Sequence, residues 1–325
     1  MKELTYTVAA REALDEEMAR DPRIFVMGEG IGKRGGNFNT TLGLYEKYGP
    51  LRLCDTPIAE RGFIGLAVGA AMSGSIPVID FMMVDFILDA MGEIINQMAK
   101  MQYMSSGRLR MPMVLRGCIG IGGAAATHHS GSYYSIFSNI PGLRVIVPTT
   151  PADVKGMFRT ALRGNDPVIM LEHKNLLSNK GLVPDEDYTT PFGQARIARV
   201  GKHVTAVGVA LTVQKCVQAA EVLAKQGIEV EVIDPRSTSP LDIATILQSV
   251  KKTGRLMIVD DAFEPCGFGA EVSAQVGAHG FDDLDAPIRR LSGAFAPTPY
   301  SPPLEQEIVP SVETITKALY DLVKE

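Results

Sequence analysis

The stretch CDTPIAERGFIGLAVGAAMSGSIPVIDF, residues 54–81, decides the fold because it contains both kinds of element of which the chain is built. Pro57 ends regular structure, and Gly62–Met72 is predicted to be a helix that is apolar on almost every side. After a glycine- and serine-containing turn, the apolar run Pro77–Phe81 predicts a strand. A helix without a polar face is expected to be buried, so this helix and strand predict a covered α/β layer.

The same alternation continues on both sides of this stretch. Further strands are predicted at Ile24–Met27, Met113–Arg116, Val145–Val147 and Val168–Leu171, and further helices at Thr7–Ala19, Leu88–Tyr103 and Ala152–Leu162. Thr150 can cap the last of these helices, and Pro151 suits its first position. Strands and helices in alternation predict a mostly parallel sheet.

A change of pattern near residue 175 predicts a second domain. Asn175–Phe192 lacks periodicity, so residues 1–175 are expected to form one domain, 176–200 a linker and 201–325 a second α/β domain. Its predicted elements are strand Val204–Val209, helix Val213–Lys225, strand Glu229–Ile233, helix Ile243–Lys251, strand Leu256–Val259 and helix Val312–Val323. Five prolines between Pro297 and Pro310 predict an extended surface segment before the final helix.

Composition limits the class of protein. The 325 residues are 46% hydrophobic and 21% charged, with a net charge of −5 and no run of Lys or Arg, which argues against nucleic acid or an anionic membrane as partner. No apolar stretch reaches the roughly 18–20 residues of a membrane span, and the N-terminus lacks a secretory pattern. The four cysteines are scattered, which favours a reducing compartment and predicts a cytoplasmic protein.

Three segments are candidates for chemistry. The glycine-rich run Gly28–Gly36 contains neither GxGxxG nor GxxxxGK[ST], so a flexible loop is favoured over a phosphate cradle. Glu60 lies at the first turn of the apolar helix. Burial there would raise the pKa of its carboxyl, or the carboxylate would only complement the helix dipole, and both interpretations stand.

The third segment, Ala126–Ser132, contains His128 and His129 in a loop after a predicted strand. Such loops carry ligand sites in α/β proteins. Adjacent histidines on an extended chain face opposite ways, so at most one is expected to point into a site. No carboxylate or Cys lies at ligand spacing, so a catalytic or polar contact is favoured over a metal.

Taken together, the segments resemble the beta subunit of the decarboxylating component of 2-oxoacid dehydrogenase complexes, over essentially the whole chain. The marks are Gly28-Glu29, Tyr48-Gly49-Pro50, Asp55-Thr56-Pro57-Ile58 with Glu60, Gly65, Phe81-Met82 to Phe86, Tyr103-Met104-Ser105, His129-Ser130, Pro141-Gly142-Leu143, Pro148, Lys155-Gly156 and Asp166-Pro167-Val168. The resemblance implies a thiamine-diphosphate-binding domain of the pyrimidine type, followed by a transketolase C-terminal-like domain.

The resemblance also implies roles for residues. Glu60 would hydrogen-bond the pyrimidine N1′ of thiamine diphosphate and favour the imino tautomer that removes the thiazolium C2 proton. Phe86 would stack on the aminopyrimidine, while Met82 and Glu29 would line the same pocket. His129 would act near the site of acyl transfer to the lipoyl group.

Partners and metals follow from the same resemblance. The GDG motif that binds diphosphate and magnesium is missing from the chain, which implies that an alpha subunit holds both, within a heterotetramer of two alpha and two beta subunits. A lipoyl-bearing acyltransferase would accept the acyl group. A structural potassium site is implied at Met113, Ala161, Leu162, Gly164 and Asp166, with Gly164 replacing the usual Asp ligand.

The function implied is that of an oxidoreductase acting on 2-oxoacids with a lipoyl acceptor, active only with its alpha subunit. Phe81–Phe86 and Tyr103-Met104-Ser105 are more similar to pyruvate or acetoin enzymes than to branched-chain ones, and Glu172-His173-Lys174 is similar to acetoin enzymes. A pyruvate-type enzyme is the first expectation and an acetoin enzyme the alternative. A split transketolase-type ketol transferase is the alternative from another enzyme class. A non-catalytic scaffold is disfavoured, because it has no need for Glu60 opposite Phe86.

Overall fold

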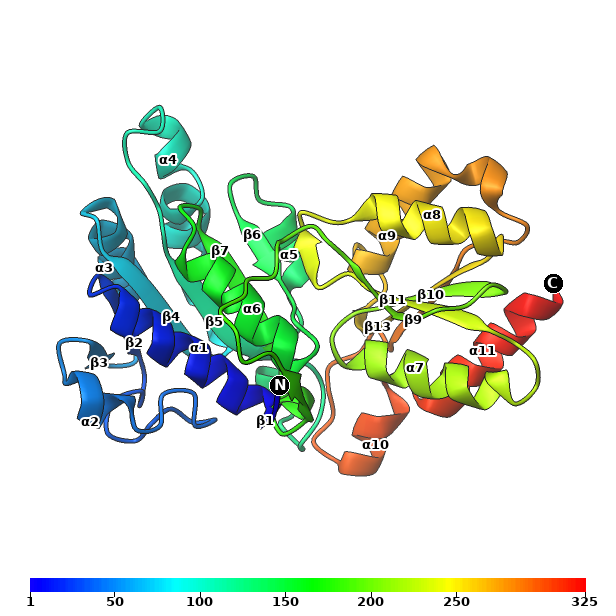
Figure 1. The fold of residues 1–325 in the computed structure, drawn as a ribbon, viewed down its shortest axis with the longest axis horizontal. Coiled ribbons are helices and arrows are strands. Elements are labelled where there is room, and N and C mark those ends of the chain that lie inside the picture. Colours follow the sequence, from blue (N-terminus) through cyan, green and yellow to red (C-terminus); the bar gives the residue numbers. More distant parts are fainter. The chain divides into compact units, whose positions relative to one another are not determined.

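The computed structural model describes residues 1–325, which fold into two compact units (Figure 1). The first unit comprises Met1–Ile119 and Ile136–Phe192. The second comprises Gly120–Ser135 and Gly193–Glu325, so the loop that carries His128 and His129 belongs to the C-terminal unit. Each unit is an α/β layer structure, which confirms the predicted fold class.

The first unit is built on a parallel sheet with the strand order β6-β7-β5-β4-β2-β3. Its strands are β2 (Ile24–Gly28), β3 (Leu53–Asp55), β4 (Ile76–Met83), β5 (Val114–Ile119), β6 (Arg144–Ile146) and β7 (Val168–His173). β4, β5 and β7 are buried along most of their length, as expected for central strands of a parallel sheet covered by helices.

Helices α1 (Tyr6–Arg20) and α6 (Pro151–Leu162) lie side by side on this sheet (Figure 1). Thr150 caps α6 by accepting a 3.1 Å hydrogen bond from the Asp153 amide, as the sequence predicts. The remaining helices and turns of the unit are α2 (Leu44–Tyr48), α3 (Glu60–Met72), α4 (Met101–Met104), α5 (Tyr134–Ser138, which begins at the boundary of the two units) and the 3₁₀ turn η4 (Lys174–Leu176).

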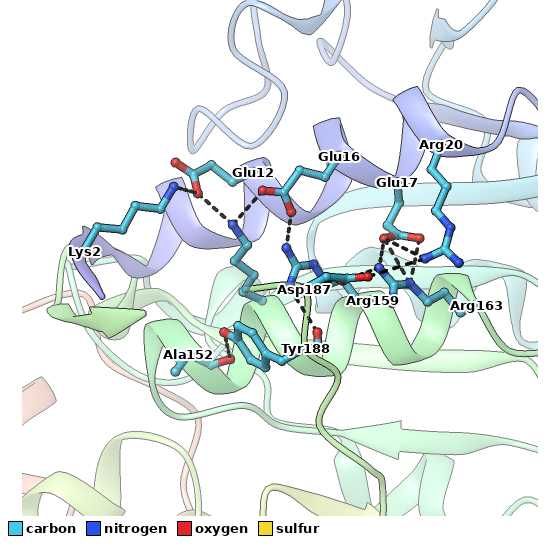
Figure 2. Close-up of polar contacts among 11 residues, drawn as sticks. Lys2, Glu12, Glu16, Glu17, Arg20, Ala152, Arg159, Arg163, Asp187 and Tyr188 are labelled. Carbon is cyan, nitrogen blue, oxygen red and sulfur yellow. Dashed lines mark hydrogen bonds and ion pairs between the residues drawn. The ribbon is translucent and has the colours of Figure 1, made fainter. Parts of the chain in front are cut away.

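Charged side chains join α1 to α6 (Figure 2). The buried Lys155 ammonium donates to Glu12 and Glu16 at 2.8 Å each, and Arg163 donates through Nε to both oxygens of the buried Glu17 at 3.1 Å. Buried ions need such partners because their desolvation is costly. The network therefore fixes how the two helices pack.

Three predictions for this unit are wrong. Leu88–Tyr103 is not one helix: a 3₁₀ turn η1 (Val84–Ala90), a π-helical turn η2 (Glu93–Met98) and α4 replace it, and Ala99 N–H bonds the Ile94 carbonyl across an i→i+5 turn. Helix α3 is not buried on every side, because Leu66 is 56% exposed and Gly62 and Gly65 beside it are exposed.

The third difference concerns residues 176–200, which were expected to form a linker. They include β8 (Lys180–Val183), which pairs antiparallel with β1 (Lys2–Thr5) in the first unit. They also include β9 (Arg196–Arg199), which pairs antiparallel with β11 in the second. These four-residue strands are too short to produce a detectable alternation, and their partners define them.

The second unit has its own sheet with the strand order β14-β13-β10-β11-β9. Its elements are β10 (Val204–Gly208), α7 (Leu211–Ala224), β11 (Val230–Asp234), β12 (Ser237–Ser239), α8 (Ile243–Thr253), β13 (Leu256–Phe263), α9 (Phe268–His279), η5 (Phe281–Asp283) and β14 (Arg289–Gly293). Helices α7 and α11 (Val312–Lys324) lie on one face of the sheet, and α8 and α9 on the other (Figure 1). Leu223, Val232 and Leu319 are among the residues of the core between α7, α11 and the sheet.

The proline-rich stretch before α11 contains a short helix, α10 (Pro302–Glu307), so the prediction of a fully extended segment is wrong. Two prolines open this helix because the first helical turn needs no N–H donors. Ser311 and Thr314 form a capping box at the start of α11. None of the helices combines the length and the apolar character that crossing a bilayer requires.

Candidate active site

Three neighbouring strands of the first unit are in register where β2 and β3 end, and β4 continues to Met83. Gly28 of β2 pairs with Asp55 of β3 on one side and with Asp80 of β4 on the other. The loops that leave these strands therefore meet at the carboxyl edge of the sheet, where parallel α/β folds bind ligands. Glu29, Glu60 and Met82 all lie in these loops or at their ends.

Two carboxylates face this edge. Glu29 directly follows β2 and is half-buried, and Glu60 is the first residue of α3 and also half-buried. Burial and the nearby charge of Glu60 raise the pKa of the Glu29 carboxyl. The charge of Glu60, at the start of α3, therefore acts on Glu29, directly after β2.

Phe86 lies in η1, which directly follows β4. The side chain of Arg61, next to Glu60, donates a 2.8 Å hydrogen bond to the Asp89 carbonyl, which joins the first turn of α3 to the end of η1. The rings of Phe63 on α3 and Phe81 on β4 pack with their centroids 5.4 Å apart. Phe86 keeps 36% of its surface exposed, so one part of its ring is open to a ligand.

Met82 has an unusual backbone. It adopts φ +64° at a register shift between β4 and β5, which turns its side chain out of the regular strand. Such a left-handed conformation costs a non-glycine residue roughly 1–2 kcal/mol, and strain of this kind often accompanies functional sites. The side-chain amide of Asn37, from the glycine-rich loop, contacts the Met82 sulfur.

The glycine-rich run is part of a loop held by defined contacts. The Gly32 amide donates a 2.9 Å hydrogen bond to Asp55, and a Cβ on Gly32 would lie 2.4 Å from the same carboxylate. Gly30, Gly35 and Gly36 have positive φ, which glycine adopts without strain. The run is thus a loop and not a regular element, its flexibility stays a prediction, and its glycines allow close packing against Asp55 and Thr40.

His128 and His129 lie in a 3₁₀ turn of the second unit, η3 (Thr127–His129). His128 is exposed and His129 is half-buried, so the two side chains have different surroundings. The loop is anchored within its own unit: Thr127 donates to the Thr298 carbonyl at 3.0 Å, and the Ala124 amide donates to Glu305 at 3.2 Å. Tyr134, near the end of the loop, donates a hydrogen bond to the buried Asp260.

The residues of the implied potassium site are engaged with protein groups. The Met113 carbonyl accepts from the Val168 amide at 2.9 Å, and the Ala161 carbonyl accepts from Gly164 at 3.2 Å. Asp166 is paired with Arg144 at 3.0 Å. No group of three or more His, Cys, Asp or Glu side chains is arranged to hold a metal ion. The potassium site stays a prediction.

The site of the first unit fits an aminopyrimidine. Glu60 provides a carboxyl that can share a proton with a ring nitrogen, and Phe86 provides an aromatic face. Met82 and Glu29 provide a soft apolar contact and a second polar group beside them. Sequence reasoning missed Asp80 and Thr40, which are hydrogen-bonded to each other; a carboxylate in a buried strand is a signal that could have found Asp80, but none points to Thr40.

Comparisons with known proteins identify two domains along the chain. The family model described as the transketolase pyrimidine binding domain matches residues 2–180, and that of the transketolase C-terminal domain matches residues 193–315. The beta subunit of acetoin:2,6-dichlorophenolindophenol oxidoreductase from Cupriavidus necator is 42% identical, over 99% of this chain and 98% of that protein.

Pyruvate dehydrogenase E1 beta subunits are equally similar. The mitochondrial protein of Dictyostelium discoideum is 43% identical over 98% of this chain and 90% of its own length. The protein of Rickettsia felis is 42% identical over 98% of this chain and 99% of its own length. The chain belongs to the family of pyruvate and acetoin dehydrogenase beta subunits.

Solved structures agree with the fold of this beta-subunit family. A split-gene transketolase, described as an inactive beta4 tetramer, superposes with a TM-score of 0.80 at 21% identity, covering 99% of this chain and 98% of that chain. Transketolase from Leishmania mexicana superposes with a TM-score of 0.71 at 14% identity, covering all of this chain and 46% of that chain. At these identities the likeness concerns the fold alone.

Proposed function

We propose that this chain is the beta subunit of a thiamine-diphosphate-dependent 2-oxoacid dehydrogenase that decarboxylates its substrate and acylates a lipoyl group together with an alpha subunit. The observation that carries the proposal is the pairing of Gly28 with Asp55 and Asp80 at the carboxyl edge of the first sheet, with the charge of Glu60 acting on Glu29. We propose that Phe86 and Met82 complete the pocket there, because a hydrogen bond from Arg61 to Asp89 joins the start of α3 to the end of η1. A carboxyl beside an aromatic face is the set of groups that an aminopyrimidine needs.

When bound, thiamine diphosphate supplies an electron sink for decarboxylation. The chain's own contribution is positioning and proton transfer. Glu60 holds a proton at the pyrimidine N1′, and Phe86 and Met82 hold the ring in place. His129 serves the later acyl transfer, and magnesium and the diphosphate are bound by the alpha subunit.

Exposed apolar side chains of the first unit support a partner chain. Tyr103 is 89% exposed and Ile58 82%, and Leu66 lies on the exposed face of α3. Large apolar side chains left exposed are typical of surfaces that a partner covers. We propose that the alpha subunit covers this surface in a heterotetramer of two alpha and two beta subunits, and that a lipoyl-bearing acyltransferase docks to the assembly.

Pyruvate and acetoin stand as the two candidate substrates. The relatives named for them are 43% and 42% identical, and both align along almost the whole chain. We favour a pyruvate-type enzyme; the sequences Phe81–Phe86 and Tyr103-Met104-Ser105 are similar to those of pyruvate and acetoin enzymes alike and do not separate the two substrates.

Co-expression with an alpha-type chain tests the proposal. The purified assembly should reduce an artificial acceptor with pyruvate or acetoin in a thiamine-diphosphate-dependent reaction. It should also acylate a lipoyl domain when the substrate is a 2-oxoacid. Transfer of a ketol group between sugar phosphates without any lipoyl acylation would identify a split transketolase instead. Calorimetry showing micromolar, magnesium-dependent binding of the cofactor by this chain alone would contradict the divided site.

A further inference from the structure

The buried carboxylate of Asp80 is bonded to two segments that form the pyrimidine pocket. Its Oδ2 accepts a 2.7 Å hydrogen bond from the hydroxyl of Thr40, at the end of the glycine-rich loop. Its Oδ1 accepts a 2.9 Å hydrogen bond from the backbone amide of Met82. One side chain therefore connects loop 29–41 to the turn that carries Met82.

The bond to Met82 explains how its backbone is held. A carboxylate that accepts from the amide two residues later closes a local side-chain turn. This turn lies where the register between β4 and β5 shifts, and Met82 adopts φ +64° there. Without the bond, an ordinary extended conformation would return the Met82 side chain to the strand.

The surroundings leave Asp80 little freedom to move. Arg116 lies opposite Asp80 in the β4–β5 ladder and pairs with Glu172 at 2.8 and 2.9 Å. Burial lowers the pKa of the Arg116 guanidinium, but the charges of Glu172 and Asp80 raise it above its ordinary value. On the other side, a Cβ on Gly28 would lie 2.3 Å from the Asp80 carbonyl oxygen, so β2 packs directly against this residue.

We propose that Asp80 is a positioning residue for the pyrimidine pocket: its carboxylate fixes both the Met82 turn and the end of loop 29–41, which carries Glu29 and Asn37. The inference rests on the proposed function, because it concerns the pocket in which the cofactor would bind. In this role Asp80 would not contact the cofactor itself. It would fix the positions of Met82 and loop 29–41, which would line the pocket.

Two variants and one control test the role. Asp80→Ala removes both hydrogen bonds, and Thr40→Val removes one of them without a change of shape. Thr150→Val is the control, because it also removes a hydrogen bond from a Thr to a buried Asp of the same unit, the 2.6 Å bond to Asp153, together with the cap at the start of α6. Hydrogen exchange is measured on the purified chain, and thiamine diphosphate affinity on the assembly with the alpha-type chain.

We expect faster amide exchange in residues 29–41 and 82–90 of Asp80→Ala, and in 29–41 of Thr40→Val. The dissociation constant of thiamine diphosphate should rise about tenfold in Thr40→Val, the effect of one lost hydrogen bond, and further in Asp80→Ala. Thr150→Val should leave the exchange of these segments and the affinity unchanged.

Unchanged exchange in both pocket variants would overturn the inference, as would an affinity in Thr40→Val equal to that of Thr150→Val. If Asp80→Ala does not fold, the amide exchange and the thiamine diphosphate affinity of Thr40→Val test the inference by themselves. An assembled wild type that binds no thiamine diphosphate would instead refute the proposed function, and the exchange data alone would then decide whether Asp80 holds the two segments.

Discussion

Burial, together with the charge of Glu60 at the start of α3, raises the pKa of Glu29, which directly follows β2. Two like charges at a half-buried edge oppose folding unless a ligand or a proton separates them. Like charges held close together are typical of functional sites, where residues that serve catalysis reduce the folding stability of the protein.

Glu29→Gln should therefore stabilise the chain at neutral pH. The raised pKa means that the folded state binds the Glu29 proton more tightly than the unfolded state does, so ionisation above that pKa costs stability. We expect a higher free energy of unfolding than wild type at pH 7, and no difference at a pH below the ordinary pKa of Glu. Urea denaturation measures both. Glu46→Gln, on the exposed face of α2, is a control with the same change of net charge.

The second unit also contains a carboxyl group whose pKa is raised, and the shift is larger. Burial and the charge of Asp261 raise the pKa of Asp260 from its ordinary value of 3.8 to about 7. Between these values the folded state keeps the proton while the unfolded state has lost it, so the free energy of unfolding of this unit should fall as pH rises through this window. Above about pH 7 this decline should end.

Asp260→Asn should remove most of that pH dependence, because an amide does not titrate. Asp242→Asn makes a useful contrast in the same unit. Despite burial, hydrogen bonds from Thr245 and Ala195 lower the pKa of Asp242, so its carboxylate stabilises the fold at neutral pH. Asp242→Asn should accordingly lose stability at pH 7. A pH dependence in Asp260→Asn equal to that of wild type would refute the role assigned to Asp260.

The charged network between α1 and α6 predicts that one substitution will cause a large loss of folding stability. Arg163→Met leaves the buried Glu17 without its bidentate partner, which typically costs about 3–5 kcal/mol of stability. The double variant Arg163→Met with Glu17→Leu should recover most of this loss, because no buried charge is left without a partner. Asp187, which also loses its bond to Arg163, is exposed. Lys317→Met breaks an exposed pair with Asp321 and should cost no more than about 0.5 kcal/mol. Equal effects of the two single variants in urea denaturation would contradict this view of the network.

Much of the fold could be predicted because its elements carry strong local signals. The apolar runs of β2, β4 and β7 and the cap and proline of α6 are visible in the residues themselves. The π-helical turn at Glu93–Met98 and the short strands β8 and β9 depend on packing and pairing partners, so no local pattern indicates them.

The site, like the fold, could be predicted from the sequence only in part. The roles of Glu60, Phe86 and Met82 follow from a resemblance to known proteins, and the ends of β2, β3 and β4 agree with their being close. Thr40 and Asp80 are separated by 40 residues, and only the fold of loop 29–41 over β4 brings them to hydrogen-bonding distance. No spacing in the sequence could have joined them.

The C2 proton exchange of bound thiamine diphosphate in an assembled Glu60→Gln variant tests the central claim most directly. Gln keeps the size of the side chain and can still hydrogen-bond N1′, but it cannot share a proton there. The account predicts cofactor affinity close to wild type and exchange slowed by roughly 10²–10⁴-fold, the usual loss of one positioned acid–base group. If Glu60 only complements the dipole of α3, the variant should lose about 0.3–1 kcal/mol of stability and exchange at the wild-type rate, and that result would contradict the account.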